Sequence, residues 1–362
     1  MKKNAVKITC KLLCFLAIFC VLFLSVQSVF KYKGWDTLYI DVRLKSYQEA
    51  ADKGEQIDVV ALGSSPLFRG MVPMTMYHDT GMTVYNFGSS RQNAMCEYYL
   101  LKSVVKINVP KVVVLDLNSL FQDRKSDETF SITYYQTLDG LADNSIRNEL
   151  IEAILQDNPD QNRIDLMFPL LRSHSEWESL DEADYTGETP DYKEYAKGCL
   201  IGTLIKNLGN KTNYLTEAQL SQETQVKEIS EYSLSWYEKI ISLCEENGIK
   251  VAVVSVPITT SGLQVDKYKT FERFCSENKI PYFNYATQEK IAETGISAWN
   301  HYHDEGHLNL RGGMRLSRIM ARDFQNQFGF DDKRGDPMYA DWDQDWAEFY
   351  NDYQELVDNM NQ

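Results

Sequence analysis

Short apolar runs alternate with longer amphipathic stretches over most of the chain. Runs rich in β-branched and aromatic residues predict five buried strands, at Ile57 to Leu62, Thr83 to Phe87, Lys111 to Leu117, Lys250 to Val256 and Pro281 to Tyr285. Amphipathic patterns predict helices between them, at Pro66 to Thr80, Gln92 to Val105, Leu234 to Asn247 and Lys267 to Asn278. This alternation favours an α/β fold in which helices cover both faces of a parallel sheet.

The N-terminus carries a different pattern, an uncharged run of 19 residues from Leu12 to Phe30. Its length suits a transmembrane helix. Four lysines and no acidic residue precede it, so the positive-inside rule places residues 31–362 outside the cytoplasm. A cleaved signal peptide is the alternative, but its apolar region is usually about 7 to 15 residues long and ends in small residues. The residues Ser25-Val26-Gln27 fit such a cleavage site poorly.

The patterns divide the chain into a cytoplasmic tail (1–11), a membrane anchor (12–30), a juxtamembrane segment (31–56) and one large α/β domain (57–330). Within this domain the alternation lapses at about 121–233, which indicates an insertion after the third strand that could wall a site or bind a partner. In the tail (331–362), aromatic and apolar residues recur at steps of three and four, which predicts an amphipathic helix packed on the domain: Trp342, Trp346, Phe349, Tyr353 and Leu356.

Charge and cysteine usage narrow the function classes. The net charge is −15, and the part after the anchor holds 33 basic and 52 acidic residues, a net charge of −19. Such a domain is repelled by nucleic acid, so no nucleic-acid partner is expected. Four cysteines follow the anchor without Cys-x-x-Cys spacing, which favours buried free thiols and leaves a disulfide open: Cys96, Cys199, Cys244 and Cys275.

Two short strings could supply a serine nucleophile and its base. Gly63-Ser64-Ser65 closes the first predicted strand and precedes Pro66, which places Ser65 at a strand-to-helix turn. Asp304 and His307 are three residues apart, close enough for the carboxylate to orient the imidazole. Both strings also have structural readings, since Ser65 suits a helix cap and Asp304 to His307 suits a loop before a helix capped by Asn309.

These strings resemble blocks of the SGNH hydrolase family, also called the GDSL family, in a membrane-anchored branch of bacterial envelope proteins. More distantly, the chain is similar to proteins that transfer D-alanine to lipoteichoic acid. Gly63-Ser64-Ser65 matches the first block, with Ser64 where many members have Asp. Gly88 in Asn86-Phe87-Gly88 matches the second block and Asn118 the third, although Asp116 stands at the usual glycine position and Ser119 at the usual aspartate. Asp304 and His307 match the last block.

The resemblance implies a flavodoxin-like three-layer sandwich with a five-stranded parallel sheet in the order 2-1-3-4-5. It also implies catalytic roles for Ser65, His307 and Asp304, and an oxyanion hole built from the N–H groups of Ser65 and Gly88 and the side chain of Asn118. Without the resemblance, Gly88 reads as a loop glycine and Asn118 as a strand-end turn residue.

The expected activity is a serine-dependent O-acyltransferase, without cofactor, that acts on an envelope glycan or teichoic-acid-like acceptor and takes its acyl group from a membrane-bound donor protein. An esterase of the same family and a non-catalytic envelope scaffold are the alternatives. Transferase and esterase share every catalytic group.

A few polar residues remain open to a binding or a structural role. Arg172, His174 and Trp177 lie in one short stretch of the insertion and could line a sugar-binding cleft or simply be structural. His303 could contact substrate. The segment from His301 to His307 is also rich in potential metal ligands, but the sequence holds no second such cluster, and no metal site is predicted.

Overall fold

The computed structural model describes residues 2–31, 40–122, 130–186, 193–209, 214–259 and 264–361. Its centre is a five-stranded parallel sheet in the order β2-β1-β3-β4-β5. The strands are β1 (Val59–Leu62), β2 (Val84–Asn86), β3 (Val112–Asp116), β4 (Lys250–Ser255) and β5 (Tyr282–Asn284). All five predicted strands are confirmed, and the strand order is the one that the resemblance implies.

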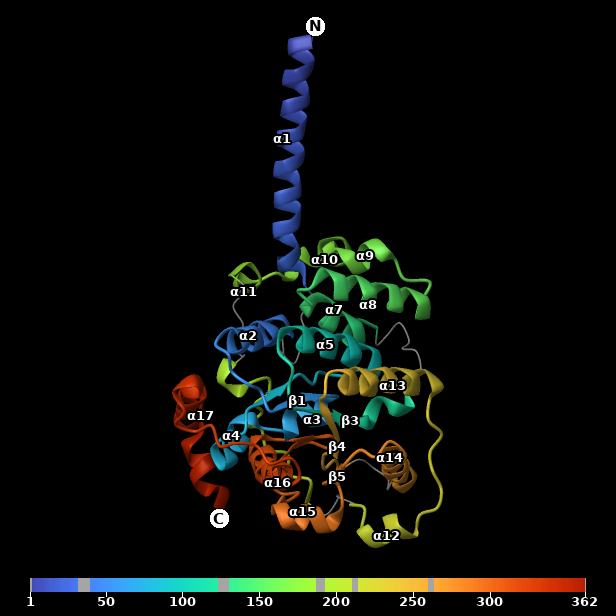
Figure 1. Cartoon of the computed structure of the whole chain (residues 1–362), viewed down its shortest axis with the longest axis vertical. Coiled ribbons are helices and arrows are strands. Elements are labelled where there is room, and N and C mark those ends of the chain that lie inside the picture. Colours follow the sequence, from blue (N-terminus) through green and yellow to red (C-terminus); the bar gives the residue numbers. More distant parts are fainter. Residues whose placement is uncertain are drawn as a thin grey trace.

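Helices cover both faces of the sheet. The continuous apolar runs of the predicted strands indicate this, because successive side chains of a strand point to opposite faces. Along β1, Val60 and Leu62 belong to one apolar cluster, while Val59 and Ala61 belong to the other. Helices supply the first cluster from α2 (Ile40–Asp52), α5 (Ala94–Ile107), α13 (Glu231–Glu246) and α14 (Val265–Glu277). The second receives residues from α3 (Ser65–Gly70), α4 (Pro73–Thr80), α15 (Gln288–Thr294) and α16 (Leu310–Phe328). Figure 1 shows these helices around the sheet.

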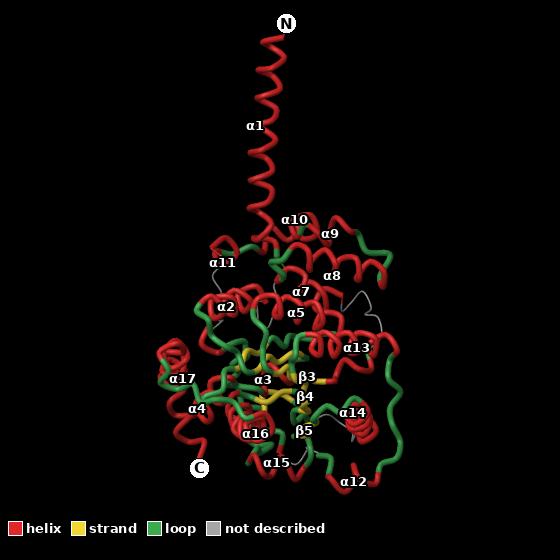
Figure 2. Tube along the Cα trace, viewed as in Figure 1, coloured by secondary structure: helices red, strands yellow, loops and turns green. Residues whose placement is uncertain are grey.

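The insertion after β3 is mostly helical. It comprises η2 (Leu117–Phe121), η3 (Ser131–Tyr135), α7 (Gln136–Gly140), α8 (Asn144–Asp157), α9 (Arg163–Met167), α10 (Pro169–Ser173), η4 (His174–Ser179), α11 (Glu182–Thr186), η5 (Glu194–Ala196) and α12 (Glu217–Gln222). Residues 123–129, 187–192 and 210–213 of the expected insertion lie outside the described residues. In Figures 1 and 2, α8 to α11 form the end of the domain nearest the N-terminal helix.

Both chain ends carry long helices. The helix α1 (Lys2–Val26) and the following η1 (Gln27–Phe30) include the expected anchor and are long and apolar enough to cross a membrane. At the other end, η7 (Pro337–Tyr339) leads into α17 (Ala340–Asp358), followed by η8 (Asn359–Asn361). Trp342 and Phe349 of α17 are buried, so the predicted C-terminal helix packs on the domain.

From Ile40 on, the juxtamembrane segment packs against the α/β domain. Residues 32–39 lie outside the described range, but α2 contributes Ile40, Leu44 and Tyr47 to the core. The predicted helix from Pro66 to Thr80 is two helices, α3 and α4, because Pro73 starts a new one.

Candidate active site

The turn after β1 presents Ser65 at the sheet's carboxyl edge. Gly63 has a φ of 152°, and a Cβ there would lie 2.8 Å from Cγ of Asp116, so this tight turn needs glycine. Ser64 is the N-cap of α3 but its side chain caps no helix N–H, and Ser65 is the first helical residue. Ser65 is partly exposed, whereas Ser64 is buried. The helix-cap interpretation of the Ser65 hydroxyl is therefore wrong.

Asp304 and His307 lie on a small hairpin that the sequence did not predict. Asp304 ends β6 (Tyr302–Asp304) and His307 begins β7 (His307–Leu308), and the two strands pair antiparallel. Gly306 N–H donates to Oδ1 of Asp304 at 2.8 Å. Asn309 then caps α16 by accepting from Gly312 N–H, as expected.

A hydrogen-bonded chain joins the three side chains. Nε2 of His307 lies 2.7 Å from Oγ of Ser65, and Nδ1 lies 2.8 and 2.9 Å from the two carboxylate oxygens of Asp304. Burial would raise the pKa of Asp304, but the hydrogen bonds from His307 and Gly306 outweigh it and lower that pKa. An ionised Asp304 holds Nδ1 protonated and leaves Nε2 free to accept the Ser65 proton.

A second polar network lies behind this chain. Oδ2 of Asp116 accepts hydrogen bonds from Ser64, at 2.7 Å from Oγ and 2.9 Å from the backbone N–H. Nδ2 of Asn118 donates to Ser64 Oγ at 3.2 Å, and Oδ1 of Asn118 accepts from Nζ of Lys267 at 2.7 Å. Because an ammonium group can only donate, Lys267 fixes the amide so that its N–H groups face the serines. One N–H of the amide bonds to Ser64, and among the described residues the second has no partner in hydrogen-bond geometry.

Gly88 is held in place from two sides. Its N–H donates to Oδ1 of Asn86 at 3.1 Å, and its carbonyl accepts from Nη1 of buried Arg43 at 2.8 Å. The N–H that the sequence proposes for the oxyanion hole is thus already bonded. Gln92 ties this loop to the nucleophile turn, since its Oε1 accepts from Gly63 N–H at 2.9 Å.

His303 lies beside the triad, between Asp304 and Arg69. Burial lowers the pKa of His303, and the Arg69 guanidinium lowers it further. Its Nδ1 is buried and has no hydrogen-bond partner in the part of the chain that the structure describes, and a Cβ at Gly202 would lie 3.3 Å from it. Gly202 itself accepts from Leu310 N–H at 2.7 Å. The segment around Gly202, in the later part of the insertion, therefore passes over the β6–β7 hairpin next to His303.

His301 points away from the triad. Its Nδ1 accepts from Ser297 N–H at 2.8 Å, and burial lowers its pKa to about 4. Within the ranges that the structure describes, no group of three His, Cys, Asp or Glu residues is arranged to hold a metal ion. The four cysteines after the anchor are buried free thiols, as predicted.

A buried carboxyl group lies beneath the site. Glu97 on α5 is fully buried, and burial together with the charge of Asp116 raises its pKa well above the usual range. Among the described residues neither carboxyl oxygen has a partner in hydrogen-bond geometry. The nearby Tyr237 and Ser119 hydroxyls lower the pKa of Glu97, but by less than burial raises it.

Arg172, His174 and Trp177 are not part of this constellation. Arg172 pairs with Asp139 and lies over the ring of Tyr135, and Nδ1 of His174 contacts the carbonyl of Leu171. Trp177 is exposed on η4, at the end of the domain beside α1.

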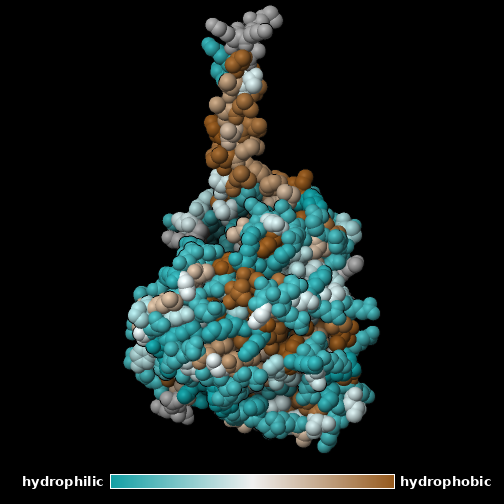
Figure 3. Space-filling view, in the orientation of Figure 1, coloured by the Kyte–Doolittle hydropathy of each residue, from teal (hydrophilic) through white to brown (hydrophobic). Residues whose placement is uncertain are grey.

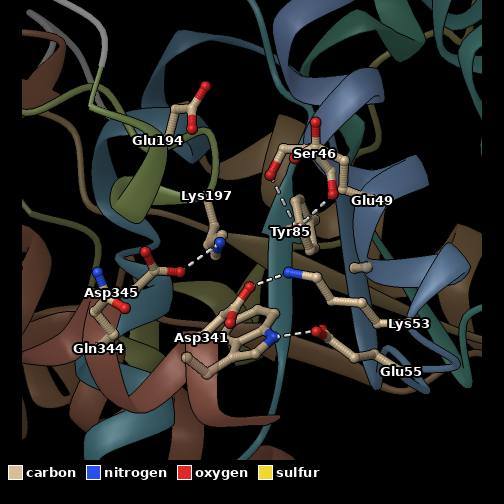
Figure 4. A pocket seen from close by; sticks show the side chains of 12 residues that line it. Ser46, Glu49, Lys53, Glu55, Tyr85, Glu194, Lys197, Asp341, Gln344 and Asp345 are labelled. Atoms are coloured by element: carbon tan, nitrogen blue, oxygen red, sulfur yellow. Dashed lines mark hydrogen bonds and ion pairs between the residues drawn. The ribbon is translucent and has the colours of Figure 1, made fainter. Parts of the chain in front are cut away.

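A separate hollow of about 190 Å³ lies between α2, α17 and the segment around Lys197 (Figure 4). Several of its charged groups are paired: Lys53 with Asp341, Lys197 with Asp345 at 2.5 Å, and Glu55 with the indole N–H of Trp342 at 2.8 Å. These contacts attach α17 to the domain and suit a structural role.

Sequence reasoning missed Arg43, Gln92, Glu97 and Lys267. Each comes from a different helix or loop, and no local motif marks them. No family model matches the chain, and no curated protein resembles it significantly.

Proposed function

We propose that this chain is a membrane-anchored serine acyltransferase of the SGNH type, with a flavodoxin-like three-layer sandwich, that acylates an extracytoplasmic glycan or glycopolymer. One observation carries the proposal: the chain of hydrogen bonds from Ser65 through His307 to Asp304. Such a chain gives a serine hydroxyl a base and gives the base an orienting carboxylate.

In the proposed first step, Ser65 Oγ attacks the carbonyl carbon of an ester or thioester donor while Nε2 of His307 takes the hydroxyl proton. Asp304 stabilises the imidazolium that forms. The Ser65 N–H and the free N–H of Asn118 are the donors for the tetrahedral oxyanion. Collapse of this intermediate breaks the bond to the leaving alcohol or thiol, which receives the proton from His307.

The acyl-Ser65 ester then reacts with an acceptor hydroxyl. His307 removes the proton of a sugar hydroxyl as its oxygen attacks the acyl carbon, and the new ester leaves as Ser65 regains its proton. Water in place of the sugar would complete hydrolysis instead, so exclusion of water decides between transferase and esterase.

Two of the three departures from the family pattern, Ser64 and Asp116, lie against each other, which supports a working site rather than a decayed one. Ser64 stands where many members have Asp, Asp116 stands at a usual glycine, and the two side chains are hydrogen-bonded at 2.7 Å. A carboxylate thus remains under the nucleophile turn, supplied by the neighbouring strand.

Two features favour transfer over hydrolysis. The anchor confines the domain to one surface, where a membrane-bound donor and an envelope acceptor are also concentrated. The end of the insertion also covers part of the site next to His303 and Arg69, which favours a shaped acceptor path.

Intact-mass measurement of the full-length protein in detergent tests the proposal. Incubation with acyl esters and thioesters should add one acyl mass to the wild-type chain and none to Ser65→Ala. Addition of teichoic-acid-like or other envelope glycans should then remove this mass and yield an acylated glycan. Loss of the mass at the same rate without glycan would assign an esterase, and the absence of any adduct across the donor panel, together with no serine-probe labelling, would favour a scaffold.

A further inference from the structure

Exposed apolar side chains gather on the helices around the base of α1. Ile164 on α9, Leu171 on α10, Trp177 on η4 and Tyr185 on α11 are exposed by 52, 39, 62 and 67%. In Figure 1 these helices form the end of the domain from which α1 emerges, and in Figure 3 the apolar surface of α1 continues onto the domain at its base. We call these four residues the collar.

Contacts to α1 place the collar helices beside the apolar helix rather than below it. The ring of Phe168, between α9 and α10, lies edge-on to Phe23 with 5.2 Å between the centroids. The N–H of Leu170 donates to Oε1 of Gln27 at 3.1 Å. Phe23 and Gln27 both belong to the uncharged run that ends at Phe30. The collar helices therefore reach the level of the membrane span.

The length of the run fixes where the bilayer ends. At about 1.5 Å per residue, 19 residues cover about 29 Å, close to the roughly 30 Å of a hydrocarbon core. With Lys11 at the cytoplasmic boundary, the outer boundary falls near Phe30. Phe23 lies seven residues before it, so Phe168 sits about 10 Å below that boundary, among acyl chains.

We propose that the collar rests in the outer interface of the same bilayer that α1 crosses. Trp177 and Tyr185 have the amphipathic rings that favour the headgroup level, and Ile164 and Leu171 supply apolar area beside them. The domain is strongly acidic, so apolar contact rather than attraction to anionic lipid holds it there. The catalytic domain is then fixed in height and tilt above the membrane rather than swinging on a tether.

Quenching of tryptophan fluorescence by brominated lipids tests the proposal on the full-length chain. The protein is reconstituted in phosphatidylcholine vesicles with or without bromine on the acyl chains. Only protein that resists a carbonate wash is measured, because such protein is held by the membrane span. A failure of the anchor is therefore recognised separately from a failure of the collar to reach the bilayer. Trp177→Phe is compared with Trp299→Phe, since Trp299 is also exposed, by 52%, and lies five residues after α15. Figure 1 shows α15 at the end of the domain opposite α1. The remaining tryptophans contribute equally to both variants.

Trp299→Phe should show at least the lipid-quenched fraction of the wild type, because it removes a tryptophan that lipid does not reach, and Trp177→Phe should lose a clear part of that fraction. This difference should persist in high salt, because apolar contact is not screened. Equal quenching of the two variants would overturn the proposal. A second result would also overturn it. In that case lipid does not quench Trp177, and its access to aqueous acrylamide falls as more protein is loaded per vesicle, because a second copy of the chain covers the collar.

Discussion

At the scale of single residues, the proposed chemistry depends on which of two adjacent serines is the nucleophile. Ser65 Oγ contacts the imidazole of His307, whereas Ser64 Oγ is buried against Asp116. Ser65→Ala should abolish labelling by a fluorophosphonate probe, and Ser64→Ala should retain it because the base remains in place. The readout is the labelled band after electrophoresis. Labelling that survives in Ser65→Ala and disappears in Ser64→Ala would transfer the role to Ser64.

Lys267 should act on the reaction through Asn118, because its ammonium fixes which end of the amide faces the serines. Asn118→Ala should lower kcat by about 10²- to 10³-fold if the amide is an oxyanion donor. Lys267→Met should lower kcat in the wild-type background but add little to Asn118→Ala, which a double-mutant cycle measures. Lys269→Met is the matched control, since Lys269 on the same helix pairs with Glu272. Additive losses in the cycle would show that Lys267 acts independently of the amide.

Because burial raises the pKa of Glu97, we expect the free energy of unfolding to fall as the pH rises. The native state favours the protonated carboxyl, so the wild type loses stability as pH rises above the ordinary carboxyl range, about 4.3 in unfolded chains. Glu97→Gln keeps the shape without the charge. Its urea midpoint should exceed that of the wild type by more at pH 8 than at pH 5, whereas Glu245→Gln on an exposed position of α13 should show no such trend. An equal gain at both pH values would contradict this account.

These residues also show what the sequence could and could not predict about the site. Ser65, Asp304 and His307 each lie in a short local pattern at a strand end, so both strings could be recognised by eye. Glu97 and Lys267 lie on ordinary amphipathic helices, and their roles depend on tertiary contacts that no local pattern encodes. The binding role considered for Arg172 had a local signal, yet a buried ion pair with Asp139 accounts for that residue.

At the scale of elements, the strands β1 to β4 were predictable because they are buried over most of their length and read as mostly continuous apolar runs, whereas the half-buried edge strand β5 was marked by its aromatic residues. The β6–β7 hairpin was not, because its two short strands consist mostly of polar residues, His303, Asp304 and His307 among them, and so show no apolar run. The break between α3 and α4 had a visible cause in Pro73, although the apolar spacing continues across it.

The segment that leads from η5 over the site should be sensitive to a single methyl group. Gly198 has a φ of 91°, and a Cβ there would lie 1.9 Å from the carbonyl oxygen of Asn86. Gly54 has a similar φ of 82° with nothing within 4 Å. Gly54→Ala should therefore cost about 1 kcal/mol of unfolding free energy from backbone strain alone. Gly198→Ala should cost clearly more, as measured by urea unfolding, and equal costs would show that the segment moves aside freely.

At the scale of the whole molecule, the apolar helix sets where any chemistry takes place. Four lysines precede the 19-residue uncharged run, and the domain follows it directly. We expect the run to stay attached and the domain to face outward. Protease added to intact cells or protoplasts should digest the domain while a cytoplasmic marker survives, and carbonate-washed membranes should keep the full-length chain. A soluble chain that begins near residue 28 in the culture medium would contradict the anchor, remove the confinement that favours transfer, and leave a secreted esterase as the better account of Ser65.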